Sequence, residues 1–389
     1  MLVVQKYGGS SLATPKHIQS AAKRIADLKK SGASVVVVAS AMGHMTDHLL
    51  KLAGKTVQVP PPREVDMLLT AGERISMSLL SMALQDLGVP AISFTGSQSG
   101  IITTNDHTEA KIVDIRPNRI VEEIALGKVV IIAGFQGVSE KKEITTLGRG
   151  GSDTTAVALA AVLKADRCEI LTDVEGLFSA DPRVVPEAKV LTQVDYESAL
   201  EMASLGAKMQ ARSIELAKKY NVDVRILSSK NIEAKGTQIS SQQNRNLEPM
   251  EKVSVSGVAT QSGFSFFRAK ISSHQFLMLT KHTPVSLRFA SQSPSEVLFL
   301  CEKEKLAVIR SYFQKEEIQF FEQEDVVTVS LVGDGFVNSN SVFHQILTYL
   351  DVEKIECLMT VTNSASISFV VKSEFKERLA RFFHNNLKF

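Results

Sequence analysis

The stretch TTLGRGGSDTTAVALA, residues 145–160, combines a pliable backbone, one cation and the start of a helix. Two glycines and Arg149 come just before Ser152 and Asp153, and an alanine-rich helical pattern follows at once. A helix N-terminus offers unpaired N–H groups and a partial positive charge, and glycines let a ligand approach the backbone closely. The stretch therefore suits a phosphate or a carboxylate. Taken alone, it fits a capped helix behind a tight glycine turn equally well.

The segments around this stretch alternate short β-branched runs with helical patterns. The runs are LVVQKYG, SVVVVASA, AISFT, VVIIAGF, RCEILTD and VDVRILS, separated by segments such as HIQSAAKRIADLKK. Continuous apolar runs of this kind predict an α/β fold, with a largely parallel sheet sandwiched by helices. In such sheets ligands bind where loops leave the carboxyl ends of the strands. The glycine-rich motifs stand at those predicted ends.

The composition changes sharply along the chain. Of the 19 phenylalanines, 16 lie at or beyond Phe264, whereas 18 of the 22 glycines lie before Lys252. The polar, aperiodic segment GTQISSQQNRNLEPME separates the two halves and is typical of a linker or an exposed loop. We therefore predict a first domain over residues 1–235, a linker over 236–251 and a second region over 252–389.

The second half contains two successive copies of a small α+β unit. The pattern is strand, helix, strand, strand, helix and a strand-like run, and it then repeats. The first copy runs from GFSFFRAKI to EEIQFFEQ, and the second from DVVTVSLVG to SISFVV and the helix that follows it. Neither copy contains a group of acid, base and nucleophile. This repetition favours binding or dimerisation over chemistry.

Length, charge and cysteine content narrow the functional class. A chain of 389 residues exceeds the usual size of one core, and 44% hydrophobic content without a long apolar run indicates a globular rather than a membrane protein. A net charge of +2, from 44 basic and 42 acidic residues, gives no overall field for nucleic acid or a membrane surface. Cys168, Cys301 and Cys357 lack the spacing of a zinc site or a disulfide framework, and the first residues predict a strand rather than a signal peptide. We therefore expect a reducing, cytoplasmic setting.

Several strand-end loops carry cations suited to phosphate groups. Lys6 ends the first strand before Gly8, Gly9 and Ser10, although the loop is not a GxxxxGK[ST] P-loop and the chain has no GxGxxG. LTDVEGLFSADPRV places Thr172 and Asp173 at a strand end and Arg183 after a turn; GAKMQARSIELA places Lys208 just before a helix. Together with Arg149, these cations favour phosphate transfer.

Two further motifs have simpler interpretations when taken alone. SAMGHMTDHLL places Ser40, Thr46 and Asp47 after a strand, which is typical of a capped turn. TAGERISM carries Glu73 and Arg74 at helical spacing, and a charged pair there is usually solvated or mutually paired at the surface.

In their order along the chain, the motifs resemble those of the aspartokinases, a branch of the amino acid kinase family. The matching stretches are KYGGSS, SAMGHMTD, TAGERISM, GFQGV, TTLGRGGSDTTA, TDVEGLFSADPR and GAKMQARSIE, over residues 1–230. GRGGSD followed by TDVxGxxxxDPR separates this branch from acetylglutamate, glutamate and uridylate kinases. The resemblance implies ATP-dependent phosphorylation of the side-chain carboxylate of L-aspartate, the first step of aspartate-family amino-acid biosynthesis (lysine/diaminopimelate, threonine, methionine).

The resemblance also implies roles for the matching residues. Lys6 and Asp153 would be catalytic, with Lys6 stabilising the transferring phosphoryl group. The residues implied to bind substrate are Ser40, Thr46, Glu73 for the ammonium, Arg149 for the α-carboxylate, and Ser152. The residues implied to bind the nucleotide are Lys6, Gly8, Gly9, Ser10, Thr172, Asp173, Phe178, Arg183 and Lys208. Mg²⁺ is expected with ATP, and the sequence leaves its ligands unassigned.

The second half resembles the paired ACT units of the same family, which implies a homodimer and feedback by an amino acid, lysine first and threonine second. The match departs from the family pattern: FRAKISSHQFLMLTKH lacks the usual glycine and proline before its helix, and SLVGDGFVNSNSVFHQILTYL keeps Gly333, Asp334 and Gly335 but lacks the proline and glycine near Asn340. Two alternatives stay open: another amino acid kinase of this fold, and an amino-acid-sensing protein with a non-catalytic kinase domain.

Overall fold

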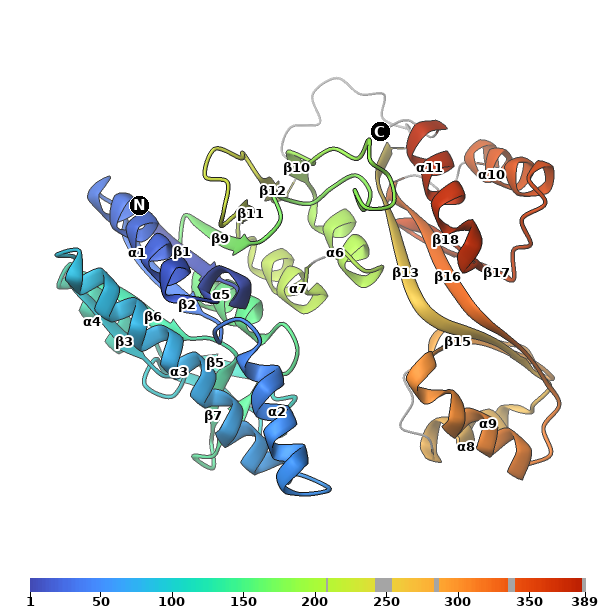
Figure 1. Ribbon diagram of the computed structural model, residues 1–389, viewed down its shortest axis with the longest axis horizontal. Coiled ribbons are helices and arrows are strands. Elements are labelled where there is room, and N and C mark those ends of the chain that lie inside the picture. The colour runs from blue at the N-terminus through green and yellow to red at the C-terminus, as the bar shows by residue number, and fades with distance from the viewer. Residues whose placement is uncertain (208, 242–253, 283–286, 335–339, 387–389) are drawn as a thin grey trace. The chain divides into compact units, whose positions relative to one another are not determined.

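The β-branched runs of the first half form one eight-stranded sheet, sheet A, in the computed structural model (Figure 1). In spatial order its strands are β10 (Gln193–Val194), β12 (Thr237–Ile239), β11 (Val224–Ser228), β9 (Arg167–Thr172), β1 (Leu2–Tyr7), β2 (Ser34–Ala39), β6 (Val129–Ala133) and β3 (Ala91–Phe94). The run from β11 to β3 is parallel throughout, and only β12 pairs antiparallel with its neighbour β11. The six strands predicted from the sequence are all present.

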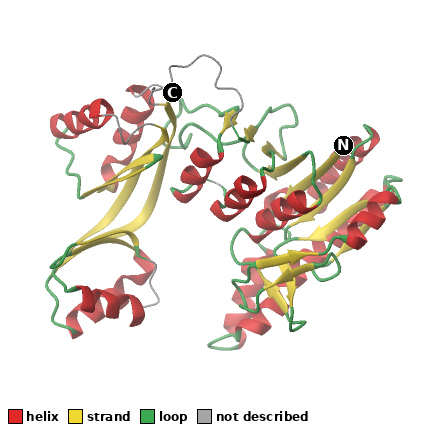
Figure 2. Cartoon of the chain, turned by 180° about the vertical axis from the view of Figure 1, so that it is seen from behind, coloured by secondary structure: helices red, strands yellow, loops and turns green. Residues whose placement is uncertain are grey.

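Helices cover both faces of sheet A, as Figure 2 shows. α1 (Pro15–Lys30) and α3 (Pro62–Asp86) pack on one face, where Val35 and Val37 of β2 join their hydrophobic cluster. Val36 and Val38 alternate with these residues and are also fully buried. α5 (Gly151–Val162) contacts β1, β2 and β9. The remaining helices of this half are α2 (Met45–Thr56), α4 (Asn118–Ala125), α6 (Tyr196–Ser204) and α7 (Ala211–Tyr220).

The helix α5 is surrounded by protein along most of its length. Nine of its 12 residues are buried, among them the run from Thr154 to Ala160. Small side chains let a helix approach a sheet closely, which explains why the alanine-rich pattern has no polar face. In the first turn of α5, Asp153 keeps partial access to solvent.

A second, four-stranded sheet was not predicted from the sequence. It runs in the order β5 (Ile112–Ile115), β4 (Ile101–Thr103), β7 (Gln136–Ser139) and β8 (Ile144–Thr146). These strands have three or four residues each, which is too short for a periodic signal. The strand β8 leads directly into the GRGGSD loop and α5.

The structure describes residues 1–389 except 208, 242–253, 283–286, 335–339 and 387–389, and these residues form two compact units. The first unit is Met1–Leu177, Val190–Ala203 and Lys208–Arg245; the second is Phe178–Lys189, Ser204–Ala207 and Asn246–Phe389. The predicted linker, 236–251, begins with β12 in sheet A, and its part from 242 onward lies outside the described residues. The assignment of separate functions to the predicted domains stays a prediction.

The second unit is built on a six-stranded antiparallel sheet. Its strands in spatial order are β14 (Arg288–Gln292), β15 (Val297–Glu302), β13 (Ser254–Ala269), β16 (Phe320–Asp334), β18 (Ser366–Lys372) and β17 (Met359–Asn363). Its helices are α8 (Ser273–His282), α9 (Leu306–Lys315), α10 (Asn340–Val352) and α11 (Lys376–Asn386). The two long strands β13 and β16 run side by side through the unit (Figure 1).

The two α+β copies are interleaved through these long strands. The first copy begins in the C-terminal part of β13, which pairs with β15, and ends in the N-terminal part of β16. The second copy begins in the C-terminal part of β16, and residues 254–262 of β13 pair beside it. The runs EEIQFFEQ and DVVTVSLVG therefore contribute to one continuous strand, and the edge that closes the second copy comes from a segment before the first.

The phenylalanines fill the cores of these copies. Phe267, Phe299 and Phe313 pack together in the first copy, with ring centroids 5.3–6.4 Å apart. Phe369 and Phe383 lie in the core of the second. This accounts for the change in composition along the chain.

Within the described ranges, none of the helices combines the length and apolar character needed to span a bilayer.

Candidate active site

The parallel strands of sheet A bring four loops to one edge. The strands β9, β1, β2 and β6 follow one another in this order in the sheet and all run in the same direction, so their carboxyl ends lie along one edge. Backbone hydrogen bonds join these ends: Ser40 donates to Tyr7 (3.1 Å), Gly134 to Ala39 (3.0 Å) and Gly8 to Leu171 (3.2 Å). The segments that begin at Gly8, Ser40, Gly134 and Asp173 therefore leave the sheet at a common edge.

Lys6 and Asp153 form an ion pair at this edge. Lys6 lies in the central strand β1, and its Nζ is 2.7 Å from Oδ1 of Asp153 in the first turn of α5. The two side chains keep only 13% and 17% of their exposure to solvent. A largely buried cation beside a helix N-terminus attracts an anion, because both carry positive charge. Asp153 balances this charge in the free protein.

The N-terminus of α5 is shaped by glycine rather than by a capping side chain. Gly150 is the residue before the helix, with φ of 72°, and having no side chain it makes no capping hydrogen bond. Ser152 and Asp153 lie inside the first turn, so the alternative in which they cap the helix is not what the structure has. The carboxylate of Asp153 pairs with Lys6 instead.

Two glycines permit the close approach of neighbouring loops. A Cβ on Gly9 would lie 2.9 Å from the carbonyl oxygens of both Ala41 and Gly43. A Cβ on Gly134 would lie 2.7 Å from Oγ of Ser152. Both positions exclude any side chain without movement of the backbone or of α5. Gly134, in the GFQGV motif, had been given no role from the sequence, and a glycine directly after a buried strand was the available signal.

Glu73 is buried, so the expectation of a solvated or mutually paired surface charge is wrong for it. Its side chain projects from α3, where the residue is 3% exposed, and Oε1 accepts a hydrogen bond from the backbone N–H of Ala41 (3.2 Å). Oε2 has no partner among the described residues. Burial raises the pKa of the Glu73 carboxyl to about 7. A buried carboxylate oxygen without a donor is suited to a cationic ligand group.

The other residues implied to bind substrate lie after β2, on α2 and at the start of α5. Ser40 follows β2, and its carbonyl oxygen accepts a hydrogen bond from Oγ of Ser76 on α3 (2.6 Å). Thr46 lies half-buried in the first turn of α2, beyond the loop whose Gly43 donates to the carbonyl oxygen of Gly9. Arg149 is exposed in the loop before α5. Ser76 was missed in the sequence, where it resembled any small helical residue.

The nucleotide residues of the first unit lie at two strand ends. Gly8, Gly9 and Ser10 follow β1, where Gly9 and Ser10 begin the 3-10 turn Gly9–Leu12. Thr172 ends β9; its hydroxyl donates to Asp173 (3.2 Å), and its carbonyl oxygen accepts from the backbone N–H of Ser229 (2.8 Å). The strands β1 and β9 are adjacent, so these two groups share the same stretch of the edge.

Three residues implied to bind the nucleotide are not among the described residues at this edge of the first unit. Phe178 and Arg183 belong to the second unit, in which the Arg183 guanidinium pairs with both carboxylate oxygens of Asp181 (3.0 and 2.7 Å). Lys208 lies outside the described residues. The nucleotide roles of these three side chains stay predictions.

Comparisons with known proteins agree with the motifs. Residues 1–228 match the model of the amino acid kinase family. Over 230 residues, 59% of this chain, the sequence is 58% identical to the aspartokinase of Mycolicibacterium smegmatis; the alignment covers 55% of that protein, about half its length. Over 410 aligned residues, covering 100% of this chain and 96% of the relative, it is 40% identical to the aspartokinase of Corynebacterium glutamicum. Among solved structures, the fold is similar to that of E. coli aspartokinase III in complex with aspartate and ADP, with a TM-score of 0.82, 23% identity and 100% coverage of both chains.

We predict that Glu73→Gln changes the pH dependence of stability. The folded-state pKa of about 7 lies above the ordinary value of 4.5, so the stability contributed by protonated Glu73 is fully present below about pH 4.5 and is lost as the pH rises through 7. Glutamine does not titrate. The free energy of unfolding of the variant relative to the unsubstituted protein should therefore rise by about 2 to 3 kcal/mol between pH 5 and pH 8.

Urea unfolding at several pH values measures this difference. The exposed Glu122 on α4 gives a matched control, because Glu122→Gln makes the same chemical change at the surface. Parallel curves of unfolding free energy against pH for Glu73→Gln and the unsubstituted protein would show that folding does not raise the pKa of Glu73.

Proposed function

This chain belongs to the amino acid kinase family, and from that membership and the strand-end geometry we propose that it transfers the γ-phosphoryl group of ATP to the side-chain carboxylate of L-aspartate. The observation that carries the proposal is the Lys6–Asp153 pair at the N-terminus of α5, held between loops that leave no room for a Cβ. The 40% identity to an aspartokinase over the whole chain supports aspartate as the substrate. The protein is accordingly an ATP-dependent aspartate kinase.

The reaction needs little proton chemistry. The aspartate carboxylate is already ionised near neutral pH, so its oxygen attacks the γ-phosphorus directly while the bond to the ADP oxygen breaks. The products are 4-phospho-L-aspartate and ADP. Positioning of the two substrates and neutralisation of their charges therefore account for catalysis.

Lys6 and the N-terminus of α5 supply the neutralising charge. Lys6 is anchored in the central strand, and its ammonium group is already held near the helix by Asp153. Asp153 thus keeps Lys6 in place before the phosphoryl group arrives. The backbone of Gly8, Gly9 and Ser10 lies next to Lys6 and is proposed to hold nucleotide phosphates.

The amino-acid substrate is proposed to lie toward α3. The unpaired oxygen of Glu73 would receive the α-ammonium group, and Arg149 would pair with the α-carboxylate. Ser40, Thr46 and Ser152 would complete the polar lining. Charge complementarity at both groups on the α-carbon would select an amino acid over a simple dicarboxylate.

The nucleotide is proposed to lie along the ends of β1 and β9. Thr172 and Asp173 would line its site there, and Phe178, Arg183 and Lys208 would complete it. Mg²⁺ is proposed to enter with ATP; bound to the phosphates, it would neutralise their charge. The described residues contain no group of three or more carboxylate, imidazole or thiolate ligands. This suits an ion held mainly by substrate phosphates, with one or two carboxylates at most.

The second unit is proposed to be regulatory and to pair with the same unit of a second subunit. It contains two α+β copies, and it exposes large apolar side chains, among them Leu277, Phe321 and Val352. An amino acid, lysine or threonine, is proposed as its feedback effector. Residues 1–235 would then be the catalytic domain, 236–251 the linker and 252–389 the regulatory region. We place the protein in the cytoplasm, in agreement with its three free cysteines.

The activity is tested by trapping the acyl phosphate product. With ATP, Mg²⁺ and hydroxylamine, aspartate should give more hydroxamate than glutamate or N-acetylglutamate. Lys6→Ala should lower kcat by about 10²-fold or more, because a charge aimed at the transition state is lost. The exposed Lys16 on α1 supplies the control variant Lys16→Ala. A preference for another amino acid, or normal turnover by folded Lys6→Ala, would contradict the proposal.

Arg149→Ala should affect one substrate far more than the other. Because Arg149 is proposed to pair with the α-carboxylate, its loss should raise KM for aspartate and leave KM for ATP nearly unchanged. Initial rates with each substrate varied in turn measure both constants, and the exposed Arg116 provides the control Arg116→Ala. Equal effects on the two KM values would place Arg149 on the nucleotide side instead.

Oligomerisation and feedback are tested on the full chain. Light scattering should give twice the chain mass of 42.5 kDa, and millimolar lysine or threonine should inhibit turnover. A coupling of about 1–3 kcal/mol would change the apparent affinity for aspartate roughly 5- to 150-fold. A monomer would refute the dimer, and indifference to both amino acids, alone and together, would refute the feedback.

A further inference from the structure

The loop that carries Arg149 is a glycine turn, in which the backbone N–H of Gly151 donates to the carbonyl oxygen of Gly148 (3.0 Å). Gly148 and Gly150 flank Arg149, with φ of 75° and 72°, and the arginine side chain is exposed. Glycines leave many backbone conformations accessible, so the position of Arg149 depends on the residues at each end of the loop. At its far end α5 begins at Gly151, while at its near end stand Thr146 and Leu147.

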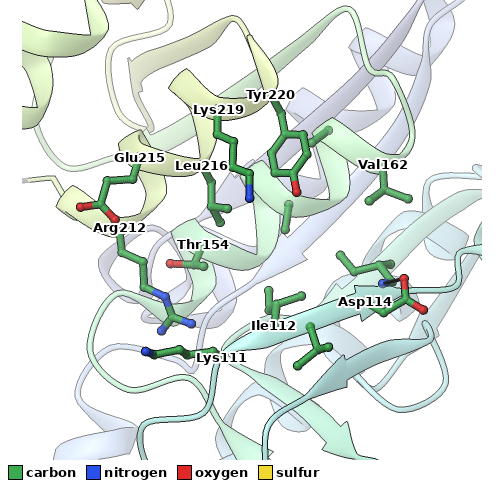
Figure 3. Close-up of a pocket in the computed structure, with 14 residues that line it drawn as sticks. Lys111, Ile112, Asp114, Thr154, Val162, Arg212, Glu215, Leu216, Lys219 and Tyr220 are labelled. Carbon is green, nitrogen blue, oxygen red and sulfur yellow. Dashed lines mark hydrogen bonds between the residues drawn. The ribbon is translucent and has the colours of Figure 1, made fainter.

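Arg212, on α7, hydrogen-bonds to the backbone at the N-terminal end of this loop. From α7, its Nη1 donates to the carbonyl oxygen of Leu147 (2.9 Å) and its Nη2 to that of Ala110 (3.0 Å). Figure 3 shows this side chain extending from α7 toward the strand that begins beside Lys111. The fork of the guanidinium lets one side chain join two backbone segments, which an ammonium group does less well. Because the group is partly withdrawn from water, desolvation lowers the pKa of Arg212 from its ordinary value.

Asp66, on α3, hydrogen-bonds to Thr146 at the same N-terminal end of the loop. This carboxylate projects from α3 and is 0% exposed. It accepts hydrogen bonds from Oγ1 of Thr146 (2.5 Å) and from the backbone N–H of Thr108 (3.1 Å), and it contacts Nδ1 of His107 (2.7 Å). A buried carboxylate is kept only where its oxygens are satisfied, and these partners lie in the two segments that meet before the loop.

Thr146 and Ala110 are themselves joined, since the backbone N–H of Ala110 donates to the carbonyl oxygen of Thr146 (2.9 Å). We propose that Asp66 and Arg212 are positioning residues that fix the Gly148–Gly150 loop, and with it Arg149, in the conformation that binds the amino-acid substrate. The substrate part of this inference rests on the proposed function. The two residues act on neighbouring positions, Thr146 and Leu147, and neither is assigned a contact with substrate.

A groove beside α5 gives access to Arg212. The groove has a volume of about 570 Å³; α5, α7 and β5 contribute to its lining, which includes Thr154, Arg212 and Lys219 (Figure 3). Removal of the Arg212 side chain would leave a space continuous with this groove. A guanidinium ion from solution can then occupy that space and donate to the same carbonyl oxygens. Lys219 lies on the same helix and lines the same groove, so Lys219→Ala removes a charge there without removing the bonds to Leu147 and Ala110.

Steady-state kinetics with added guanidinium ion test the proposal. Arg212→Ala should raise KM for aspartate about tenfold or more, because a small displacement of a binding group weakens its contact strongly, and should leave KM for ATP within about twofold. Guanidinium chloride at about 20 mM should restore part of the affinity for aspartate to Arg212→Ala but not to Lys219→Ala, which should behave like the unsubstituted enzyme. Equal KM shifts for both substrates, or equal effects of the two substitutions, would overturn the proposal.

Hydrogen exchange gives a readout independent of activity. Amide exchange in a peptide over residues 144–152 should be faster in Arg212→Ala and in Asp66→Asn, and unchanged in Lys219→Ala. Asp66→Asn also carries the kinetic test if Arg212→Ala does not fold, with the same selective rise in KM for aspartate. Unchanged exchange in both variants would refute the positioning role, even for a protein that phosphorylates aspartate. An unsubstituted protein that does not phosphorylate aspartate, yet shows the predicted exchange, would refute the proposed function and leave the positioning of the loop supported.

Discussion

The contact between Lys6 and Asp153 depends on how β1 and α5 are packed in the centre of the first unit. Lys6 reaches Asp153 only because β1 lies between β2 and β9 and because α5 packs against all three strands. That packing requires the small, apolar residues of α5, and the approach of the flanking loops requires Gly9 and Gly134. The core of the sheet and the chemistry at its edge are therefore determined by the same residues.

The helix α5 links three regions of the first unit. Its first turn carries Asp153 toward Lys6, its buried side packs on sheet A, and Thr154 lines the groove in which Arg212 lies. The cation Lys6 and the carboxylate Glu73 differ in their partners. Lys6 has a carboxylate partner, whereas Glu73 keeps one buried oxygen unsatisfied and carries a raised pKa. An unsatisfied group is costly in a stable protein unless a ligand completes it, which is the physical reason to place the substrate there.

The sequence predicted the parts of the fold that depend on long, regular patterns. The six strands of sheet A with strong β-branched runs were identified, and so were the residues that follow them, because a strand end and a glycine are both visible locally. The small sheet that includes β4 and β8 was missed, since its three-residue strands have no period. Glu73 was ambiguous because burial is decided by the packing of α3 against the Ala41 loop, which no local pattern reports. Asp66 and Arg212 were not recognised for a similar reason: their partners are backbone groups and side chains at least 40 residues away.

The interleaving of the second unit makes its two halves structurally inseparable. The strands β13 and β16 each contribute to both copies, so neither copy forms its sheet without a segment of the other. The antiparallel pairing of β13 with β16 extends through both copies. A slip of one residue reverses the faces of a strand, so the register of each long strand decides which of its side chains enter a core. The register of this ladder is not uniform, because it shifts between Val255 and Gly257, between Ser262 and Phe264, and between Phe264 and Phe266. Removal of either copy would therefore take away strand pairing on which the other copy depends.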